Sequence, residues 1–218
     1  MIDEDRVELT VVGKISDIGE FDWDACASSS DAGSRPVDPF VTYRFLKGLE
    51  DSKSIGAGTG WIPQYIVAKY NKEIIGVMPS FAKGHSQGEY IFDHNWAHAY
   101  ENSGGKYYPK LQVSIPFTPV TGRRFLTLPE FHDIAQSALL EGLKIIVSQQ
   151  KWSSAHITFC SAEEFKAGEE LGLLQRIGQQ FHWENQSYKN FDEFLMNLSS
   201  RKRKNIKKER RIAANFGG

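Results

Sequence analysis

A strand pattern followed by a turn and a long amphipathic helix constrains the fold most. Apolar and polar residues alternate over 111–117, which is the period of a β-strand with one face toward a core. The turn at 118–124 ends in Arg123 and Arg124, and apolar residues then recur at helical spacing over 128–149. Because backbone N–H groups and the positive end of a helix point the same way at such a junction, we expect the two arginines to help bind an anionic group.

The rest of the chain predicts strands and helices in alternation, with a polar loop at 28–38. Asp38 before Pro39 is a favourable helix start, and Thr127 with Glu130 has the spacing of a capping box. Strands are expected at 7–12, 64–70, 73–81, 90–93 and 155–160, with 71–72 as a hairpin turn and a second hairpin formed by 173–177 and 180–184. Helices are expected at 18–27, 39–52, 93–101, 128–149, 163–171 and 191–214. Periodicity alone therefore indicates an α/β or α+β protein.

The composition is that of a globular protein, with 40% hydrophobic and 12% aromatic residues in a chain of 218. The formal net charge of −1 gives no general attraction to nucleic acid, and DNA is not an expected partner. No apolar run approaches the roughly 20 residues that span a bilayer, and the start of the chain lacks a secretory apolar segment. We therefore expect a cytoplasmic setting in which Cys26 and Cys160 are free thiols.

Acids and potential bases gather just before the predicted helix at 93–101. Such groups could accept or donate a proton in catalysis. We predict His85, Glu89 and Asp93 as candidates for a catalytic base and Gln87 as part of a substrate pocket. The whole group comprises His85, Ser86, Gln87, Glu89, Asp93 and His94.

Two further motifs favour structural explanations. His94 and His98 could share a helix face, but the HExxH pattern of zinc hydrolases is absent. We predict no metal site, and histidines that pack or hydrogen-bond around Trp96. The glycine-rich segment 56–60 leaves a helix and enters a strand, whereas a phosphate-binding loop follows a strand and opens a helix. It is predicted to be a linker anchored by Trp61, which is also a candidate for substrate contact.

The strongest charge signal is the segment 201–211, with eight Lys or Arg and one Glu. Like charges three or four residues apart repel on a helix, so a bound phosphate would relieve the repulsion. A solvated helix face is the alternative. The residues form two adjacent faces, one of Arg201, Lys204 and Lys208 and the other of Arg203, Lys207 and Arg210.

The block 85–124, HSQGEYIFDHNWAHAYENSGGKYYPKLQVSIPFTPVTGRR, resembles the hallmark of the FemAB-like predicted N-acyltransferases. These are bacterial tandem-GNAT proteins linked by name to peptidoglycan biosynthesis. The segments 35–63 and 180–210 also fit the family pattern, so the resemblance covers the whole chain. It implies a GNAT-like fold, a mixed sheet with helices on both faces, and transfer of an acyl or aminoacyl group to an amine of a cell-wall precursor or related metabolite. Acyl-CoA or aminoacyl-tRNA would be the donor, and no cofactor would be bound tightly.

The resemblance also implies roles for particular residues. The segment 199–210 is similar to the K-x-R-x-N-I segment of Fem-type transferases, whose basic residues contact phosphates of a nucleotide-sugar or aminoacyl-tRNA. The matching residues Arg201 and Arg203, with Lys204 and Lys207 beside them, are therefore predicted to bind substrate from exposed positions, with little effect on the fold when replaced; Asn205 and Ile206 complete the match. Arg123 and Arg124 stand where GNAT enzymes bind the pyrophosphate of the acyl carrier. The usual Gln/Arg-x-x-Gly-x-Gly/Ala loop is not reproduced there, which puts a coenzyme A site in doubt.

The expected organisation is a first GNAT-like domain at 1–188 and a basic connecting helix at 189–218. By analogy with the family, a second GNAT domain of the full-length protein would follow outside this chain, so the chain alone is expected to show no transferase activity. Two other functions stay open: an acyl-CoA-dependent acetyltransferase acting on a small amine, and a non-catalytic GNAT half that binds RNA or phosphate. tRNA would be a partner if the chain takes part in aminoacyl transfer, and also if it is an RNA-binding GNAT half.

Overall fold

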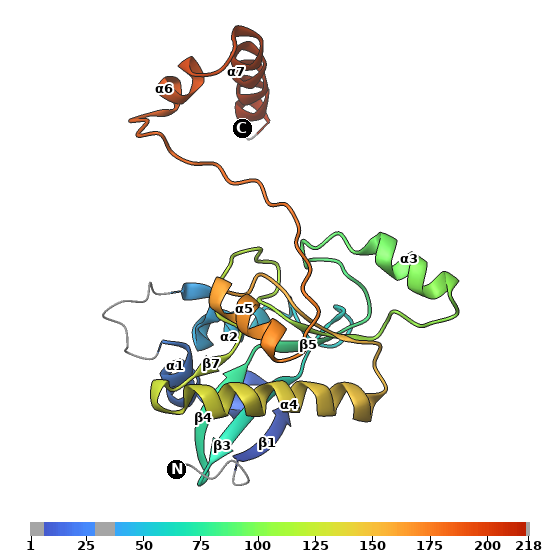
Figure 1. The fold of residues 1–218 in the computed structure, drawn as a ribbon. Coiled ribbons are helices and arrows are strands. Elements are labelled where there is room, and N and C mark those ends of the chain that lie inside the picture. Colours follow the sequence, from blue (N-terminus) through green and yellow to red (C-terminus); the bar gives the residue numbers. More distant parts are fainter. Residues whose placement is uncertain (1–6, 29–37, 217–218) are drawn as a thin grey trace. The chain divides into compact units, whose positions relative to one another are not determined.

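The computed structural model describes residues 7–28 and 38–216, so most of the predicted loop at 28–38 lies outside the described residues. The chain forms two compact units, Met1–Gln175 and Arg176–Gly218, called here the first and second unit. Figure 1 shows the elements of each. In the described ranges, no helix combines the length and apolar character needed to cross a membrane.

The first unit contains a four-stranded antiparallel sheet in the order β1-β3-β4-β7. The predicted hairpin is confirmed. Its turn residues Asn71 and Lys72 both have positive φ, 49° and 72°, which matches the right-handed twist of the two strands. The strands are β1 (Val7–Val12), β3 (Tyr65–Tyr70), β4 (Glu73–Met78) and β7 (Leu126–Thr127).

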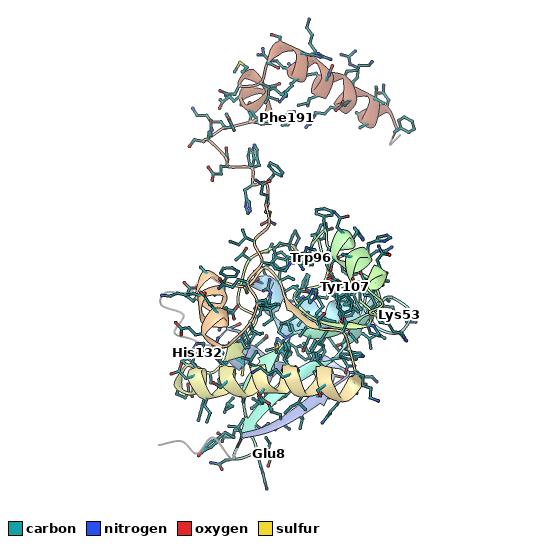
Figure 2. The ribbon with its side chains drawn as sticks, turned by 45° about the vertical axis from the view of Figure 1, so that its right-hand side comes forward. Glu8, Lys53, Trp96, Tyr107, His132 and Phe191 are labelled. Carbon is teal, nitrogen blue, oxygen red and sulfur yellow. The ribbon has the colours of Figure 1, made fainter. Side chains whose placement is uncertain are left out.

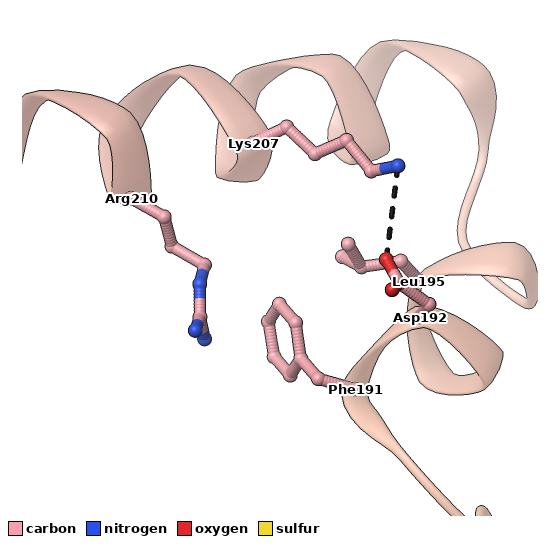
Figure 3. A pocket seen from close by; sticks show the side chains of 5 residues that line it. All are labelled: Phe191, Asp192, Leu195, Lys207 and Arg210. Atoms are coloured by element: carbon pink, nitrogen blue, oxygen red, sulfur yellow. Dashed lines mark ion pairs between the residues drawn. The ribbon is translucent and has the colours of Figure 1, made fainter. Parts of the chain in front are cut away.

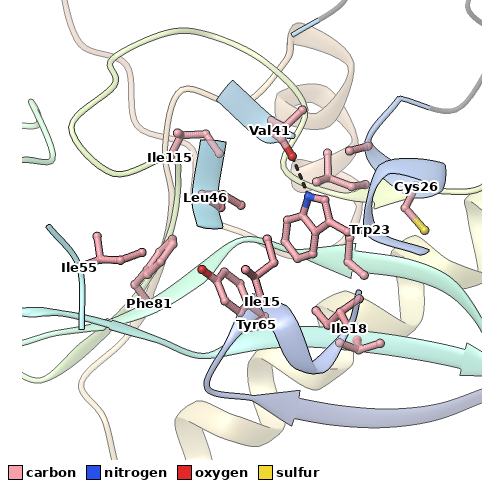
Figure 4. Close-up of a cluster of buried hydrophobic side chains, with 14 of the residues drawn as sticks. Ile15, Ile18, Trp23, Cys26, Val41, Leu46, Ile55, Tyr65, Phe81 and Ile115 are labelled. Carbon is pink, nitrogen blue, oxygen red and sulfur yellow. Dashed lines mark hydrogen bonds between the residues drawn. The ribbon is translucent and has the colours of Figure 1, made fainter. Parts of the chain in front are cut away.

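Helices cover both faces of this sheet, as predicted for a GNAT-like domain. Successive residues of β3 point to opposite faces, so Tyr65 and Val67 enter one core and Ile66 enters another. The first core, shown in Figure 4, is closed by α1 (Glu20–Ala27), α2 (Tyr43–Asp51) and the short helices η2 (Ile15–Asp17) and η4 (Pro39–Val41). The second is closed by the long helix α4 (His132–Gln150).

Buried polar atoms in the first core find partners. Trp23 Nε1 donates to the carbonyl oxygen of Val41 at 2.7 Å. Asp38 caps a helix as predicted, because its carboxylate accepts the backbone N–H of Phe40. That helix is the short η4, however, and the single helix expected at 39–52 is two elements: Thr42 is extended and caps α2, which begins at Tyr43. The predicted capping box at Thr127 is wrong: Thr127 lies in β7 with its hydroxyl on His132 Nδ1, and η5 (Pro129–Phe131) precedes α4.

A second sheet has the order β2-β5-β6-β8, formed by β2 (Trp61–Pro63), β5 (Ser80–Lys83), β6 (Lys110–Val113) and β8 (Ala155–Ile157). Strands β6 and β8 are parallel and α4 lies between them in the chain, as a parallel crossover requires. The prediction of one covered face for β6 is wrong. Gln112 is fully buried on the polar face and donates from Nε2 to Thr158 Oγ1 at 2.8 Å.

Helix α3 (His94–Asn102) lies between β5 and β6 in the chain, and α5 (Ala162–Glu170) follows β8. Both helices agree with prediction. The strand predicted at 90–93 is absent, and Tyr90 instead has a left-handed φ of 55° that interrupts extended backbone. The hairpin predicted over 173–184 is also absent. Those residues have no regular secondary structure, and Leu174, Ile177 and Phe181 are almost fully exposed.

In the second unit, the single helix predicted at 191–214 is two helices. They are α6 (Phe191–Met196) and α7 (Ser200–Asn215). The break falls at Ser199, whose side chain accepts the backbone N–H of Lys202 and so caps α7. Two short helices can pack against each other, whereas one continuous helix could not fold back on itself.

Candidate functional site

A buried ionic network joins the two central strands of the second sheet. Lys83 on β5 lies directly opposite Lys110 on β6, and both side chains are fully buried. Like charges opposed across a strand pair repel. Glu89 relieves the repulsion, with Oε2 at 2.8 Å from Lys110 Nζ and Oε1 at 3.9 Å from Lys83 Nζ. Asp93 Oδ2 makes a second contact of 2.8 Å with Lys110 Nζ, so two cations are balanced by two carboxylates.

Neutral groups complete the network. Tyr107, marked in Figure 2, donates its hydroxyl to Asp93 Oδ2 at 2.8 Å. Lys110 Nζ also donates to Ser86 Oγ at 3.0 Å. Burial alone would raise the pKa of Asp93, but hydrogen bonds from Lys110 and Ser86 and the charge of Lys110 lower that pKa to about 2. At Glu89 the effect of burial is the larger one, so the pKa of this carboxyl is raised although Lys110 lowers it.

The structure brings the predicted candidates Glu89 and Asp93 together, and both contact Lys110. Both carboxylates are buried, and a carboxylate with a pKa of about 2 is a poor proton acceptor. This geometry favours an anchoring role for both, fastening the segment between β5 and β6 to the sheet. His85 is half-buried, and its Nδ1 accepts the backbone N–H of Gln87 at 3.2 Å.

Trp61 belongs to the same structural assembly. Its ring is buried, packs edge-on against Phe81 at 5.5 Å and lies 3.6 Å from Lys83 Nζ. Burial lowers the pKa of Lys83 to about 8, although Glu89 opposes this. Trp61 Nε1 donates to the carbonyl oxygen of Gln87 at 3.2 Å. These contacts agree with the predicted anchor, and they leave the ring of Trp61 little access to a substrate.

The anion site predicted at Arg123 and Arg124 is filled by the chain's own carboxylate. The backbone N–H of Arg124 donates to both oxygens of Glu164, at 2.8 and 3.0 Å, and that of Phe125 donates at 2.8 Å. Burial raises the pKa of Glu164, against the lowering effect of these amides and of Arg124. The backbone N–H groups of Arg124 and Phe125, at the end of this turn, are therefore already paired.

Arg124 is fully buried and holds the loop together, which corrects its prediction as a ligand residue. Its guanidinium donates to the carbonyl oxygens of Thr158, Arg123 and Val120 at 2.8–3.0 Å. Arg123 donates to the carbonyl oxygen of Ala27. The N–H of Gly122 is paired as well, with the carbonyl oxygen of Phe159. The loop therefore does not fit the pyrophosphate of an acyl carrier.

The histidines of α3 lie at the surface: His94 and His98 are exposed, and the Trp96 side chain, marked in Figure 2, is 60% exposed. Within 7–28 and 38–216, no group of three or more His, Cys, Asp or Glu is placed to hold a metal ion. Cys26 and Cys160 are free thiols, the first buried and the second half-buried.

The two basic faces of α7 have different roles. Arg203 faces α6, where its guanidinium donates to the carbonyl oxygens of Leu195 and Leu198 at 3.0 Å and of Met196 at 3.3 Å. These are the end-of-helix carbonyls that lack partners within α6. Arg203, predicted to be exposed, is therefore half-buried and engaged by α6.

The other basic face of α7 is open. Arg201, Lys204 and Lys208 are exposed, and no side-chain hydrogen bond or ion pair engages them within the described part of the second unit. Of the predicted substrate-binding residues on α7, Arg201 and Lys204 are thus the ones available to a ligand. Together with Lys208 they form what we call the open cationic face.

Arg203→Ala should loosen the second unit by about 1–3 kcal/mol, the cost of leaving paired carbonyls unsatisfied and losing charged hydrogen bonds. Hydrogen exchange of the α6 amides in the full chain measures this as faster exchange. Lys204→Ala, on the open cationic face, is the matched control and should leave the rates unchanged. Equal rates in the two variants would show that Arg203 does not join the helices.

Sequence reasoning missed Lys83, Lys110 and Glu164. The lysines stand at strand ends, as the last residue of β5 and the first of β6, where a charge is ordinary and gives no sign of burial. Glu164 stands three residues after Ser161, and the two form a true capping box at α5. That spacing is readable from sequence, but the amides of Arg124 and Phe125 that Glu164 also binds lie about 40 residues away in the chain.

These features define a mixed α/β protein whose first unit packs helices on both faces of a sheet and whose second unit carries an open cationic helix face. The chain belongs to the FemAB-like family, described by the words peptidoglycan biosynthesis/recognition, whose model matches residues 14–218. No curated protein matches the chain in sequence.

Several solved structures share part of the arrangement at low identity. A possible acetyltransferase from Clostridium difficile 630 has a TM-score of 0.49 and 10% identity, covering 82% of this chain and 97% of its own. A ribosomal-protein-alanine N-acetyltransferase from Brucella melitensis biovar Abortus 2308 has a TM-score of 0.47 and 12% identity, covering 82% and 99%. Aminoglycoside N-acetyltransferase AAC(6')-Iy in complex with CoA has a TM-score of 0.47 and 11% identity, covering 82% and 94%.

Proposed function

We propose that the chain takes part in N-acyl transfer to an amine of a peptidoglycan precursor, and that the open cationic face of α7 binds the precursor's phosphates. The observation that carries the proposal is this face itself, because Arg201, Lys204 and Lys208 are exposed and unpaired within the described residues, in a chain that belongs to the FemAB-like family. Three like charges on one helix face destabilise it by a few tenths of a kcal/mol per pair. A bound diphosphate would reverse that cost.

The contribution of this chain is then to bind and orient the acceptor rather than to transfer protons. Holding an amine in the geometry of attack can lower the barrier by several kcal/mol without any acid or base. Glu89 and Asp93 are engaged by Lys110, so no proton transfer is assigned to them. The acyl donor, acyl-CoA or an aminoacyl-tRNA, is not assigned to the loop at Arg124, whose amides are paired.

RNA binding without catalysis is the second candidate, because the second unit holds ten Lys or Arg against four Asp or Glu. The dependence of binding affinity on salt concentration distinguishes RNA binding from binding of a peptidoglycan precursor. Affinity that rests on many phosphate contacts falls steeply with salt concentration, whereas a ligand held by two or three contacts is much less sensitive. The acetyltransferase hypothesis for small amines is not favoured, since it needs the acyl-carrier loop that the first unit lacks.

Calorimetric titration of the chain with a UDP-linked amino sugar and with tRNA, each at two salt concentrations, tests the proposal. Arg201→Gln and Lys204→Gln should each weaken the UDP-sugar by about 1–3 kcal/mol, the range for a charge-assisted hydrogen bond. Lys144→Gln removes an equally exposed lysine from α4 in the first unit and should change nothing. Tight tRNA binding with a steep salt slope would favour the RNA alternative, and unchanged affinities for both ligands would refute phosphate binding by this face.

A further inference from the structure

A hollow lies between α6 and α7 in the second unit. Figure 3 shows its lining, Phe191, Asp192 and Leu195 from α6 and Lys207 and Arg210 from α7. Its volume is about 380 Å³, which lies in the range of small-molecule sites. Two cations, one carboxylate and one aromatic ring therefore surround a space that a small molecule can fill.

The Arg210 side chain is oriented but has no hydrogen-bond partner. Its guanidinium carbon lies 4.2 Å from the centre of the Phe191 ring, and stacking on a ring face orients the plane of the group. The N–H groups point out from the edges of that plane, and among the described residues none accepts a hydrogen bond from them. A planar fork of this kind matches a carboxylate or a phosphate through two parallel hydrogen bonds. Arg210 is therefore in position to bind an anionic group.

The second charged pair of the hollow favours a carboxylate ligand over a phosphate. Lys207 Nζ lies 3.8 Å from Asp192 Oδ1, which is too long for a hydrogen bond. Both side chains are more than half exposed, so the pair contributes little by itself. A phosphate on Lys207 would be repelled by the adjacent Asp192 carboxylate. An α-amino acid carries an ammonium and a carboxylate on one carbon, so it can pair with Asp192 and Lys207 at once.

The charges of the whole lining match one class of amino acid. Lys207 and Arg210 are positive and Asp192 is negative, so a ligand that pairs with all three carries two carboxylates and one ammonium. Arg210 follows Lys207 by three residues, which places their Cβ atoms about 5–6 Å apart on one side of α7. The two carboxylates of glutamate or aspartate are separated by a comparable length. The methylene groups between them would lie against Phe191, whose ring is 40% exposed.

The walls of the hollow are held before any ligand arrives. Arg203 ties α7 to the last carbonyls of α6 through three hydrogen bonds, and Leu195 in the lining is 2% exposed. A preformed site avoids much of the ordering cost of binding. None of the residues of the open cationic face belongs to the lining.

We propose that the hollow between α6 and α7 binds a free dicarboxylic amino acid, glutamate or aspartate. Its ammonium pairs with Asp192, its α-carboxylate with Lys207 and its side-chain carboxylate with Arg210. This inference goes beyond the proposed function, because it involves no phosphate and no residue of the open cationic face. Each of the two can therefore fail without the other.

Calorimetric titration of the full chain with L-glutamate, glutarate and L-glutamine separates the contacts. Glutarate keeps both carboxylates and lacks the ammonium, whereas glutamine keeps the ammonium and has a neutral side chain. Each should bind about tenfold more weakly than glutamate, the effect of losing one charge-assisted hydrogen bond. Equal affinities for glutamate and glutarate would overturn the assignment of an amino acid.

Asp192→Asn tests the site through the sign of its effects. It should weaken glutamate and strengthen glutarate, because the lost carboxylate attracts an ammonium but repels a ligand that carries negative charge alone. A variant with a damaged fold would weaken both ligands, so opposite signs exclude that cause. Weakening of both ligands, or of neither, would contradict the pairing of Asp192 with the ammonium.

Arg210→Lys tests the second carboxylate contact. It keeps the charge but removes the fork, and should weaken glutamate about tenfold and glutamine much less. Arg211→Gln, which removes the neighbouring exposed arginine outside the lining, is the control and should leave glutamate binding nearly unchanged. Equal losses in the two variants would show a general attraction of α7 for anions and overturn the site. Absence of glutamate binding to the wild type would do so as well, whatever the affinity for the UDP-linked sugar.

Discussion

Lys110→Met should lower the free energy of unfolding by about 3–5 kcal/mol, because removal of one partner leaves buried charges without compensation. Lys110 Nζ contacts Glu89 and Asp93 at 2.8 Å each, and none of the three side chains reaches water to any extent. Urea unfolding followed by circular dichroism and tryptophan fluorescence measures the loss. Lys106→Met, four residues earlier and exposed, is the matched control and should cost little.

A compensated variant makes the cause testable. Combining Lys110→Met with Asp93→Asn removes one buried cation and one buried carboxylate together and leaves Glu89 beside Lys83, so it should recover part of the lost stability. A double variant less stable than Lys110→Met alone would show that packing, and not charge, holds the network. A loss below about 1 kcal/mol for Lys110→Met would place the network among weak surface pairs.

Acid should weaken the same network. The pKa of Asp93 falls from 3.8 to about 2 in the folded protein, so the ionised carboxylate stabilises the fold above pH 3.8 and that contribution is lost as the pH falls toward 2. In Lys110→Met the main causes of the lowered pKa are gone. The stability of this variant should therefore decline less between pH 4 and pH 2 than that of the wild type, and parallel curves would contradict the assignment.

Glu164→Ala should lower the free energy of unfolding by about 3–5 kcal/mol. It leaves two buried backbone N–H groups, the start of a helix and a buried guanidinium without the carboxylate. Arg124 and Phe125 donate to Glu164 at 2.8–3.0 Å, and the charge of Glu164 also faces the guanidinium of Arg124. Thermal and urea unfolding give the loss. Glu169→Ala, on the exposed side of the same helix, is the control.

The pairing of Glu164 with the loop predicts a rescue. Glu164→Gln keeps an oxygen that can accept the amides, so it should lose less than Glu164→Ala. In Glu164→Ala the freed N–H groups and Arg124 form an anion site of the kind seen at helix starts. Sulfate should then raise the melting temperature of Glu164→Ala more than that of the wild type. Equal sulfate effects in the two proteins would show that the carboxylate does not stand in for a bound anion.

Patterns carried by neighbours in the chain were readable from the sequence. The hairpin of β3 and β4, the amphipathic helix α4, the helix start at Asp38 and the basic character of α7 each depend on residues within a few positions of one another. Local propensity and periodicity act over that range. The resemblance to the FemAB-like proteins led to the mixed sheet with helices on both faces, which periodicity alone left open.

Only the tertiary structure decided which charges are free and which are used. Arg203 and Arg201 sit two positions apart in one basic run, yet the first holds the carbonyls of α6 and the second is exposed. The segment 173–184 has strand-like alternation but no strand beside it, and a strand needs a partner for its N–H and C=O groups. Arg124 finds its acceptor at Thr158, 34 residues along the chain. Such pairings are set by which distant segments meet, and local periodicity contains no information about that.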